Sequence, residues 1–145
     1  MERVLAVALL IVSPAGRIFC LEELQDKVQY EKYSGMISFP IETIEDGEDR
    51  EHALERLLRE EVGSFLFLSD PDFLGEVDMD FSTGRKSRIF CYSVLSPEEF
   101  RGNPSDTDIR FFGWKSVEEI VSLGENSRRR EVLPVFRLLQ SWEGK

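Results

Sequence analysis

Cysteine is scarce in this chain, with Cys20 and Cys91 as the only two among 145 residues. Both lie in apolar runs, at residues 18–21 and 89–95. This placement predicts buried reduced thiols rather than a disulfide framework. Such cysteine usage fits a reducing compartment, and we expect a cytoplasmic protein.

Long hydrophobic runs are also missing. After the apolar run at residues 4–12, no run is long enough to span a bilayer. Residues 4–12 are all apolar and have two interpretations, the apolar region of a signal peptide or a β-strand. The preceding Met1-Glu2-Arg3 is nearly neutral, whereas a positive start is typical of signal peptides. The following Pro14-Ala15-Gly16 favours a turn into a second strand at 17–21, so we expect a hairpin.

Positive charge is in deficit, because 18 Lys and Arg face 28 Asp and Glu, for a net charge of -10. A surface this acidic repels duplex nucleic acid and anionic membranes, which we exclude as partners. A nucleotide can still bind if a metal ion screens its phosphates. Hydrophobic residues make up 41% of the chain, which predicts an ordered globular fold. A length of 145 residues suits one domain over residues 1–145.

Strand signals recur along the chain. A half-buried strand is predicted at 76–81, a turn at 82–85 and a returning strand at 87–95. Further strands are predicted at 109–114 and, more briefly, at 37–41. Residues 24–38 are polar and read as a loop, and 65–68 form a short apolar segment. No internal repeat or linker divides these elements.

Three helices are predicted among these strands. The best one covers 49–62, and a capping box of Ser116 and Glu119 starts a short one that Gly124 ends. The last covers 127–142, with a buried stripe, a solvated basic start at 128–130, and Pro134 as a bend or first turn. The order of elements predicts an α+β fold, with a mixed sheet between helices. The buried stripe is formed by Val132, Leu133, Phe136 and Leu139.

The helix at 49–62 carries the most informative charges. Asp49 is suited to cap its start, and Gly63 suits the left-handed position after its end. At about 100° per residue, Glu61 falls inside the apolar arc, while Arg56 and Glu60 fall on its rim. The arc is formed by Ala53, Leu54, Leu57, Leu58 and Val62.

A glutamate among core-facing leucines is costly to ionise unless it is paired or bound to a metal. Two interpretations follow for Glu61. In one, it reaches water past Gly63 or pairs with Arg56 for structure alone. In the other, Glu60 and Glu61 together bind a hard cation such as Mg²⁺, which converts their mutual repulsion into binding.

Residues 42–64 resemble the Nudix box, G-x5-E-x7-R-E-U-x-E-E-x-G-U with U apolar. The resemblance implies an α/β/α sandwich and Mg²⁺ or Mn²⁺ held by Glu60 and Glu61. It also implies that Arg56 orients carboxylates and takes part in catalysis with them, and that Glu48 braces the loop. Ser38-Phe39-Pro40 looks like the entry to the box, and 112–120 like a late strand-to-helix passage of the family. The matching positions are Glu48, Arg56, Leu58, Glu60, Glu61 and Gly63.

The sequence departs from the box in three ways. Ile41 and Glu42 stand where a glycine pair is common, and Ser64 replaces the last apolar residue. Leu57 replaces a glutamate that usually binds metal or transfers protons in the family. Because Leu57 lies four residues before Glu61, we expect it to occupy the position from which a third carboxylate would face the ion. Glu42 is the candidate to compensate as a metal ligand, and the late acids Glu98, Glu99, Asp106 and Asp108 are further candidates.

The functional expectation is a Nudix-type hydrolase that cleaves a nucleoside diphosphate linked to another group. One alternative is a catalytically impaired Nudix-like domain that binds a nucleotide-like ligand or a protein partner, and another is an unrelated α+β protein with a solvated acidic helix. The substrate is not readable from spacing, and a homodimer is possible. Tyr30, Tyr33, Phe39 and Arg17 are candidates for a base pocket, although packing is the simpler role for each.

Overall fold

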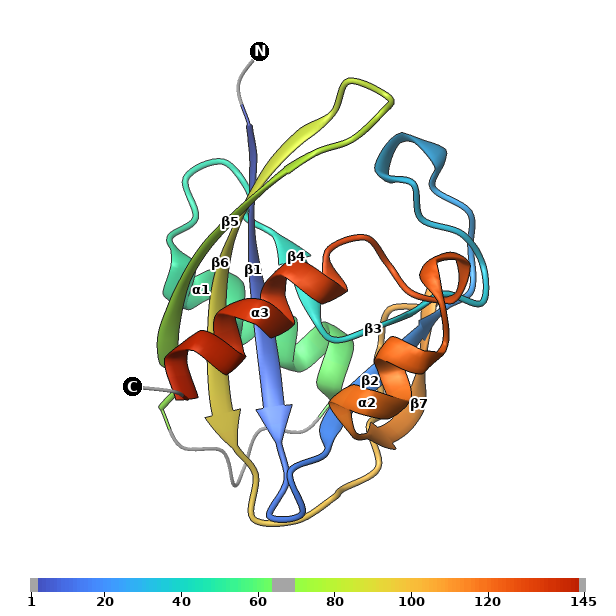
Figure 1. Ribbon diagram of the computed structural model, residues 1–145. Helices are drawn as coiled ribbons and strands as arrows, with labels where there is room; N and C mark the ends of the chain where they lie inside the picture. The colour runs from blue at the N-terminus through green and yellow to red at the C-terminus, as the bar shows by residue number, and fades with distance from the viewer. Residues whose placement is uncertain (1–2, 64–69, 144–145) are drawn as a thin grey trace.

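A seven-stranded mixed sheet forms the centre of the computed structural model, which describes residues 3–63 and 70–143 (Figure 1). The sheet follows the order β3-β2-β1-β6-β5, with β4 on β1 and β7 on β2. Strands β1 and β6 run parallel, and the other pairs are antiparallel. The strands are β1 Val4–Val12, β2 Ile18–Glu23, β3 Ile37–Ser38, β4 Ile41–Thr43, β5 Asp72–Asp80, β6 Lys86–Leu95 and β7 Ile109–Lys115.

Strand β1 shows why the sheet is buried on both faces. Ala6, Ala8 and Leu10 belong to one core cluster, while the alternate residues Val7 and Leu9 belong to another. The period of two sends successive side chains to opposite faces. Helices α2 (Val117–Ser122) and α3 (Val132–Glu143) cover the first face, and α1 (Arg50–Leu57) covers the second (Figure 1). The predicted α/β/α sandwich is confirmed, and so is the hairpin of β1 and β2.

The predicted box helix consists of two parts. Asp49 caps α1 by accepting a hydrogen bond from His52 N at 2.8 Å, as expected. The following residues form a π-helical turn, η2 (Leu58–Val62), in which Gly63 N donates to Leu58 O at 2.8 Å. Gly63 ends the turn with φ 79°, and a Cβ there would lie 2.1 Å from Asn103 O. Both the left-handed backbone and the contact with Asn103 therefore require glycine.

The last helix begins later than predicted. Residues 125–127 form a 3-10 turn, and Arg128 is extended in an isolated parallel bridge with Ile37. Arg129 N donates to Ile37 O at 3.0 Å. Pro134 lies in the first turn of α3, where a missing N–H has no cost. The expectation of a solvated basic start is wrong for Arg128 and Arg129, which are both buried.

Other boundaries differ in smaller ways. The predicted strand at 37–41 is two strands, β3 and β4, interrupted at Phe39 and Pro40. Strand β5 begins at Asp72, before the predicted start at 76, and the loop at 24–38 holds a 3-10 turn, η1 (Val28–Tyr30). The predicted segment 65–68 lies outside the described residues. Among the helices that the structure describes, none has the length and apolar character needed to cross a membrane.

Candidate active site

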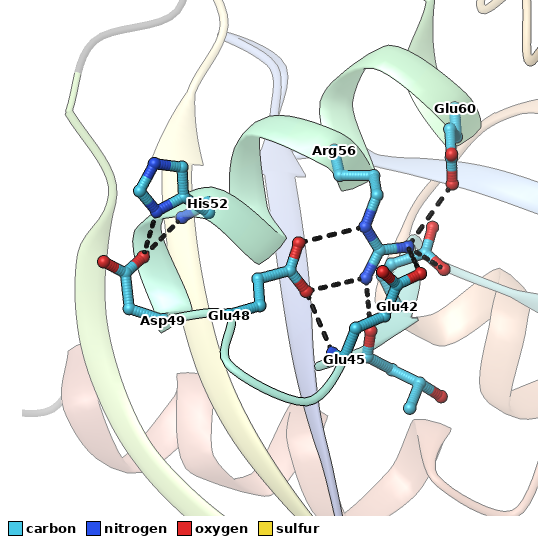
Figure 2. Close-up of polar contacts among 8 residues, drawn as sticks. Glu42, Glu45, Glu48, Asp49, His52, Arg56 and Glu60 are labelled. Carbon is cyan, nitrogen blue, oxygen red and sulfur yellow. Dashed lines mark hydrogen bonds and ion pairs between the residues drawn. The ribbon is translucent and has the colours of Figure 1, made fainter.

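Arg56 is the centre of an ionic network at the start of the site. Its Nε and Nη2 atoms form a fork on Glu48, at 3.1 and 2.9 Å, and Nη2 also donates to the Thr43 carbonyl (Figure 2). Its Nη1 atom lies 2.9 Å from Glu42 Oε1 and 3.5 Å from Glu60 Oε2. These contacts raise the pKa of Arg56 above its usual value, chiefly through the hydrogen bond to Glu48. Forked arginine contacts of this kind fix carboxylates in direction as well as distance.

Glu48 ties this network to the loop before α1. Glu48 Oε1 accepts a hydrogen bond from the Glu45 amide at 3.0 Å. The Arg56 guanidinium and this backbone donor lower the pKa of Glu48 to about 2. Glu48 therefore remains ionised and holds the loop against Arg56 at any pH near neutrality.

Glu61 is the buried carboxylate of the site, with 6% of its surface exposed. Its Oε1 atom accepts a hydrogen bond from Ile41 N at 3.1 Å. Burial and the negative charge of Glu42 raise the pKa of Glu61 well above its usual value. Burial raises the pKa of Glu42 as well. Without a cation, this pair of carboxyl groups is therefore stabilised by retaining a proton.

Glu60 lies at the edge of the site, with 38% of its side chain exposed. Its carboxylate points toward Arg56 (Figure 2), and its backbone carbonyl accepts from Ser105 N and Asp106 N, at 2.9 and 3.1 Å. These two bonds hold the late loop beside the π-helical turn. They also explain how Asp106, a predicted late-loop candidate, comes near the box.

A cavity of about 170 Å³ adjoins this network. Glu42 and Glu61 line it, as do Asp106 and Asp108 from the late loop. The other described lining residues come from β1, β4 and β6, the end of β2 and the loop after it, the start of β7, and the segment before α3. The cavity therefore brings the box together with segments that are far from it in sequence.

Leu57 does not lie where the sequence predicted. It is fully buried in the core cluster between α1 and the sheet, with Val7 and Leu9, and it is not among the residues that line the cavity. A π-helical turn has more residues per turn than an α-helix, so Glu61 no longer shares the direction of Leu57. The expectation that Leu57 occupies a ligand position is therefore wrong, because this side chain packs in the core.

Ile41 and Glu42, the residues in place of the box glycines, lie in strand β4. Ile41 pairs with Ala8 and Glu42 with Val7 of β1. An extended strand accepts β-branched and charged residues without glycine. The local chain therefore adopts a strand, from which Glu42 reaches Arg56 and the cavity.

Several other candidates lie away from the cavity. Arg17 forms an ion pair with Glu99, which also accepts a hydrogen bond from Ser13 Oγ at 2.7 Å. Phe39 is buried in the core, and Tyr33 is exposed. Of the four base-pocket candidates, Tyr30 is the one that lines the cavity.

Sequence reasoning missed five charged residues of the cavity wall. One is Lys27, which pairs with Asp108, and the other four lie together: Glu23, Lys32, Arg129 and Glu131. We call them the Arg129 cluster. Glu23 ends strand β2, and Arg129 and Glu131 directly precede α3. The only signal for them in the sequence was the charge itself, which is more often solvated than buried.

The carboxylates match the donor chemistry of a hard divalent cation. Mg²⁺ binds oxygen ligands, retains several waters and typically uses only one or two protein carboxylates together with substrate phosphates. Within residues 3–63 and 70–143, no three or more Asp, Glu, His or Cys side chains are arranged as a ready metal cage. Glu42 and Glu61 on the cavity wall, with Glu60 beside them, therefore fit a cation that is shared with a phosphate ligand.

The fold is an α/β/α sandwich, and its cavity is lined by carboxylates. A family model described as the NUDIX domain matches residues 2–136. The chain belongs to the Nudix hydrolase family. No curated protein sequence matches this chain significantly.

Solved structures show the same architecture. A NUDIX hydrolase from Nitrosomonas europaea superposes with TM-score 0.75 at 19% identity, over 99% of this chain and 90% of that one. The NUDIX domain of Shewanella oneidensis NrtR, complexed with ADP ribose, gives TM-score 0.75 at 12% identity, with the same coverage. The C. elegans Ap4A hydrolase gives TM-score 0.63 at 16% identity, over 99% and 98% of the two chains. At these identities the likeness supports the fold.

Proposed function

We propose that this protein is a metal-dependent hydrolase of nucleoside diphosphates linked to another group. The observation that carries the proposal is Glu61, a carboxylate that is almost fully buried beside Glu42 at the wall of a cavity. Ionising two neighbouring buried carboxyl groups costs free energy unless a proton or a cation lies between them. Glu42 and Glu61 would hold a divalent ion there, and that ion would supply a binding position for diphosphate oxygens.

Mg²⁺ or Mn²⁺, when bound, supplies charge neutralisation and polarises the phosphoryl centre. Glu61 and Glu42 would hold the cation from the cavity wall, with Glu60 next to Glu42. Arg56 keeps Glu42 and Glu60 in place, because its Nη1 contacts both. Asp106 lines the cavity and is the candidate to accept a proton from the attacking water.

Ligand binding without turnover is the second candidate function. It is favoured by the absence of a ready three-donor cage within the described ranges 3–63 and 70–143. The NUDIX domain of NrtR, solved in complex with ADP ribose, supports this candidate. In a domain that binds the diphosphate without cleaving it, binding would depend on Glu61 just as it does in the hydrolase.

The test is hydrolysis of a panel of nucleoside diphosphate derivatives with Mg²⁺ or Mn²⁺, by wild type and by Glu61→Gln. We expect metal-dependent product release by wild type and its loss in Glu61→Gln. Glu55→Gln is the matched control, because Glu55 is an exposed glutamate on α1, the helix that directly precedes the turn with Glu61. Equal release by wild type and Glu61→Gln would place the chemistry elsewhere. Ligand binding without release would support the second function.

A further inference from the structure

The Arg129 cluster forms a second polar wall of the cavity that holds Glu42 and Glu61. Arg129 Nη1 donates to Glu23 Oε1 at 3.2 Å, and Arg129 Nη2 donates to Glu131 Oε2. Lys32 Nζ lies 3.4 Å from Glu23 Oε1. The cluster thus joins the end of β2, the loop after it and the segment before α3 at one place.

Two atoms of this wall have no hydrogen-bond partner among the described residues: Arg129 Nε and Glu131 Oε1. Both side chains are more than nine-tenths buried, with 8% and 3% of each residue exposed, and both line the cavity. Buried polar atoms of native proteins are nearly always paired. An unpaired donor and an unpaired acceptor in two residues of a cavity wall are therefore groups that a ligand could pair.

The charges of the wall indicate what it binds. Arg129 and Lys32 balance Glu23 and Glu131, so the cluster has no excess positive charge for an additional phosphate. A donor beside an acceptor instead suits a hydroxyl group, because a hydroxyl both accepts and donates. A carboxylate acceptor makes such a bond stronger than a neutral one.

A nucleobase fits the cavity less well. Tyr30 is the one aromatic residue among the described lining residues. Its ring is already engaged, because Arg85 Cζ lies 5.1 Å from its centroid and Phe81 meets it edge-on at 5.9 Å. Base stacking needs a free aromatic face.

We propose that this cavity receives the hydroxylated sugar joined to the diphosphate, and that Arg129 and Glu131 determine specificity for it. The sugar hydroxyl accepts from Arg129 Nε and donates to Glu131 Oε1. The preferred substrates are therefore nucleoside diphosphate sugars. This inference rests on the proposed function, which places the diphosphate at Glu42 and Glu61.

The test uses two ligands of equal charge, ADP-ribose and the methyl ester of ADP, which lacks the second sugar. Affinities for both are measured by calorimetry with Ca²⁺, which occupies hard-cation sites, for wild type, Glu131→Gln and Arg129→Lys. Glu118→Gln is the control, because Glu118 is exposed on α2 and is not among the lining residues. Melting temperatures show whether each variant is folded. Arg129→Lys keeps a cation but removes the Nε donor together with the guanidinium bonds to Glu23 and Glu131, whereas Glu131→Gln removes only the charge of the acceptor.

We expect wild type and Glu118→Gln to prefer ADP-ribose by about tenfold or more, which is the worth of one charge-assisted hydrogen bond. Both cluster variants should lose this preference and keep the affinity for the methyl ester. Equal affinity of wild type for the two ligands, or no binding of either, overturns the proposal. A third ligand, the hypoxanthine analogue of ADP-ribose, tests whether the cavity holds the base instead. A cluster variant that changes the ratio of affinities for the adenine and hypoxanthine ligands also overturns the proposal.

Failure of the proposed function has a different signature. A chain that hydrolyses the methyl ester and ADP-ribose equally well is a metal-dependent hydrolase without the sugar subsite. A chain that binds ADP-ribose through Arg129 and Glu131 but releases no product has the subsite without the activity. Binding and turnover thus separate the two conclusions.

Discussion

Glu61→Gln should change how the stability of the protein depends on pH. The amide side chain of this variant keeps an oxygen that can accept from Ile41 N, but the buried charge beside Glu42 is removed. In wild type, burial raises the pKa of Glu61 in the folded state above its value in the unfolded chain. The folded state therefore binds more protons, and its stability falls as the pH rises from about 4.5 through the raised pKa.

The size of the effect follows from linkage. Each pH unit between the two pKa values costs about 1.4 kcal/mol for one group. Wild type should therefore lose stability as the pH rises from 5 toward the raised pKa of Glu61, by at most about 1.4 kcal/mol per pH unit, or about 3–6 °C in melting temperature per unit for a chain of this size. A divalent cation at about a hundred times its Kd should return about 2.7 kcal/mol at pH 7.

The assay is thermal unfolding from pH 5 to pH 8, with and without Mg²⁺, for wild type, Glu61→Gln and the exposed control Glu55→Gln. We expect Glu61→Gln to have a flatter pH profile and no stabilisation by metal, while Glu55→Gln follows wild type. The reasoning is refuted if Glu61→Gln keeps the wild-type slope and responds to metal as wild type does.

Three further substitutions test the geometry by chemical denaturation and hydrolysis assays. Arg56→Lys, which cannot form the fork on a carboxylate, should cost about 1–3 kcal/mol and reduce metal-dependent turnover. Leu57→Glu should cost about 3–5 kcal/mol without adding metal affinity, because Leu57 packs in the core. Gly63→Ala should cost more than about 2 kcal/mol, since its Cβ would meet Asn103 O, whereas Gly84→Ala meets nothing within 4 Å and should cost less.

Each of these expectations has a contrary result. A turnover number unchanged in Arg56→Lys would mean that the fork does not position the carboxylates. Tighter Mn²⁺ binding by Leu57→Glu would show that this side chain can reach the cavity after all. Equal stability of the two glycine variants would show that the contact with Asn103 relaxes at no cost.

Local patterns were sufficient for several strands, for their turns and for the caps of two helices. The alternation in 76–81, the turn at 82–85 and the capping box at Ser116 and Glu119 all appear where the sequence predicted them. Such signals depend on neighbours in the chain, so a single sequence contains them. The burial of Glu61 was also predictable, because leucines flank it at helical spacing.

The burial of Arg129 depends on a nonlocal contact and could not be predicted from local patterns. Arg129 is buried because Glu23, more than a hundred positions earlier, accepts its hydrogen bond. No periodicity near residue 129 reports that partner. The direction of Leu57 was missed for another reason, since a helical wheel at constant angle cannot contain the π-helical turn that follows it.

The parallel pairing of β1 with β6 has a consequence for how the molecule forms. Val4 is in register with Ser87. During synthesis β1, the innermost strand of the sheet, therefore cannot pair with β6 until a much later part of the chain has been made. Loop closure over such a separation slows folding, and both apolar faces of β1 remain uncovered in the meantime. We therefore expect nascent chains that stop before residue 95 to need a chaperone, whatever the strength of their local helices.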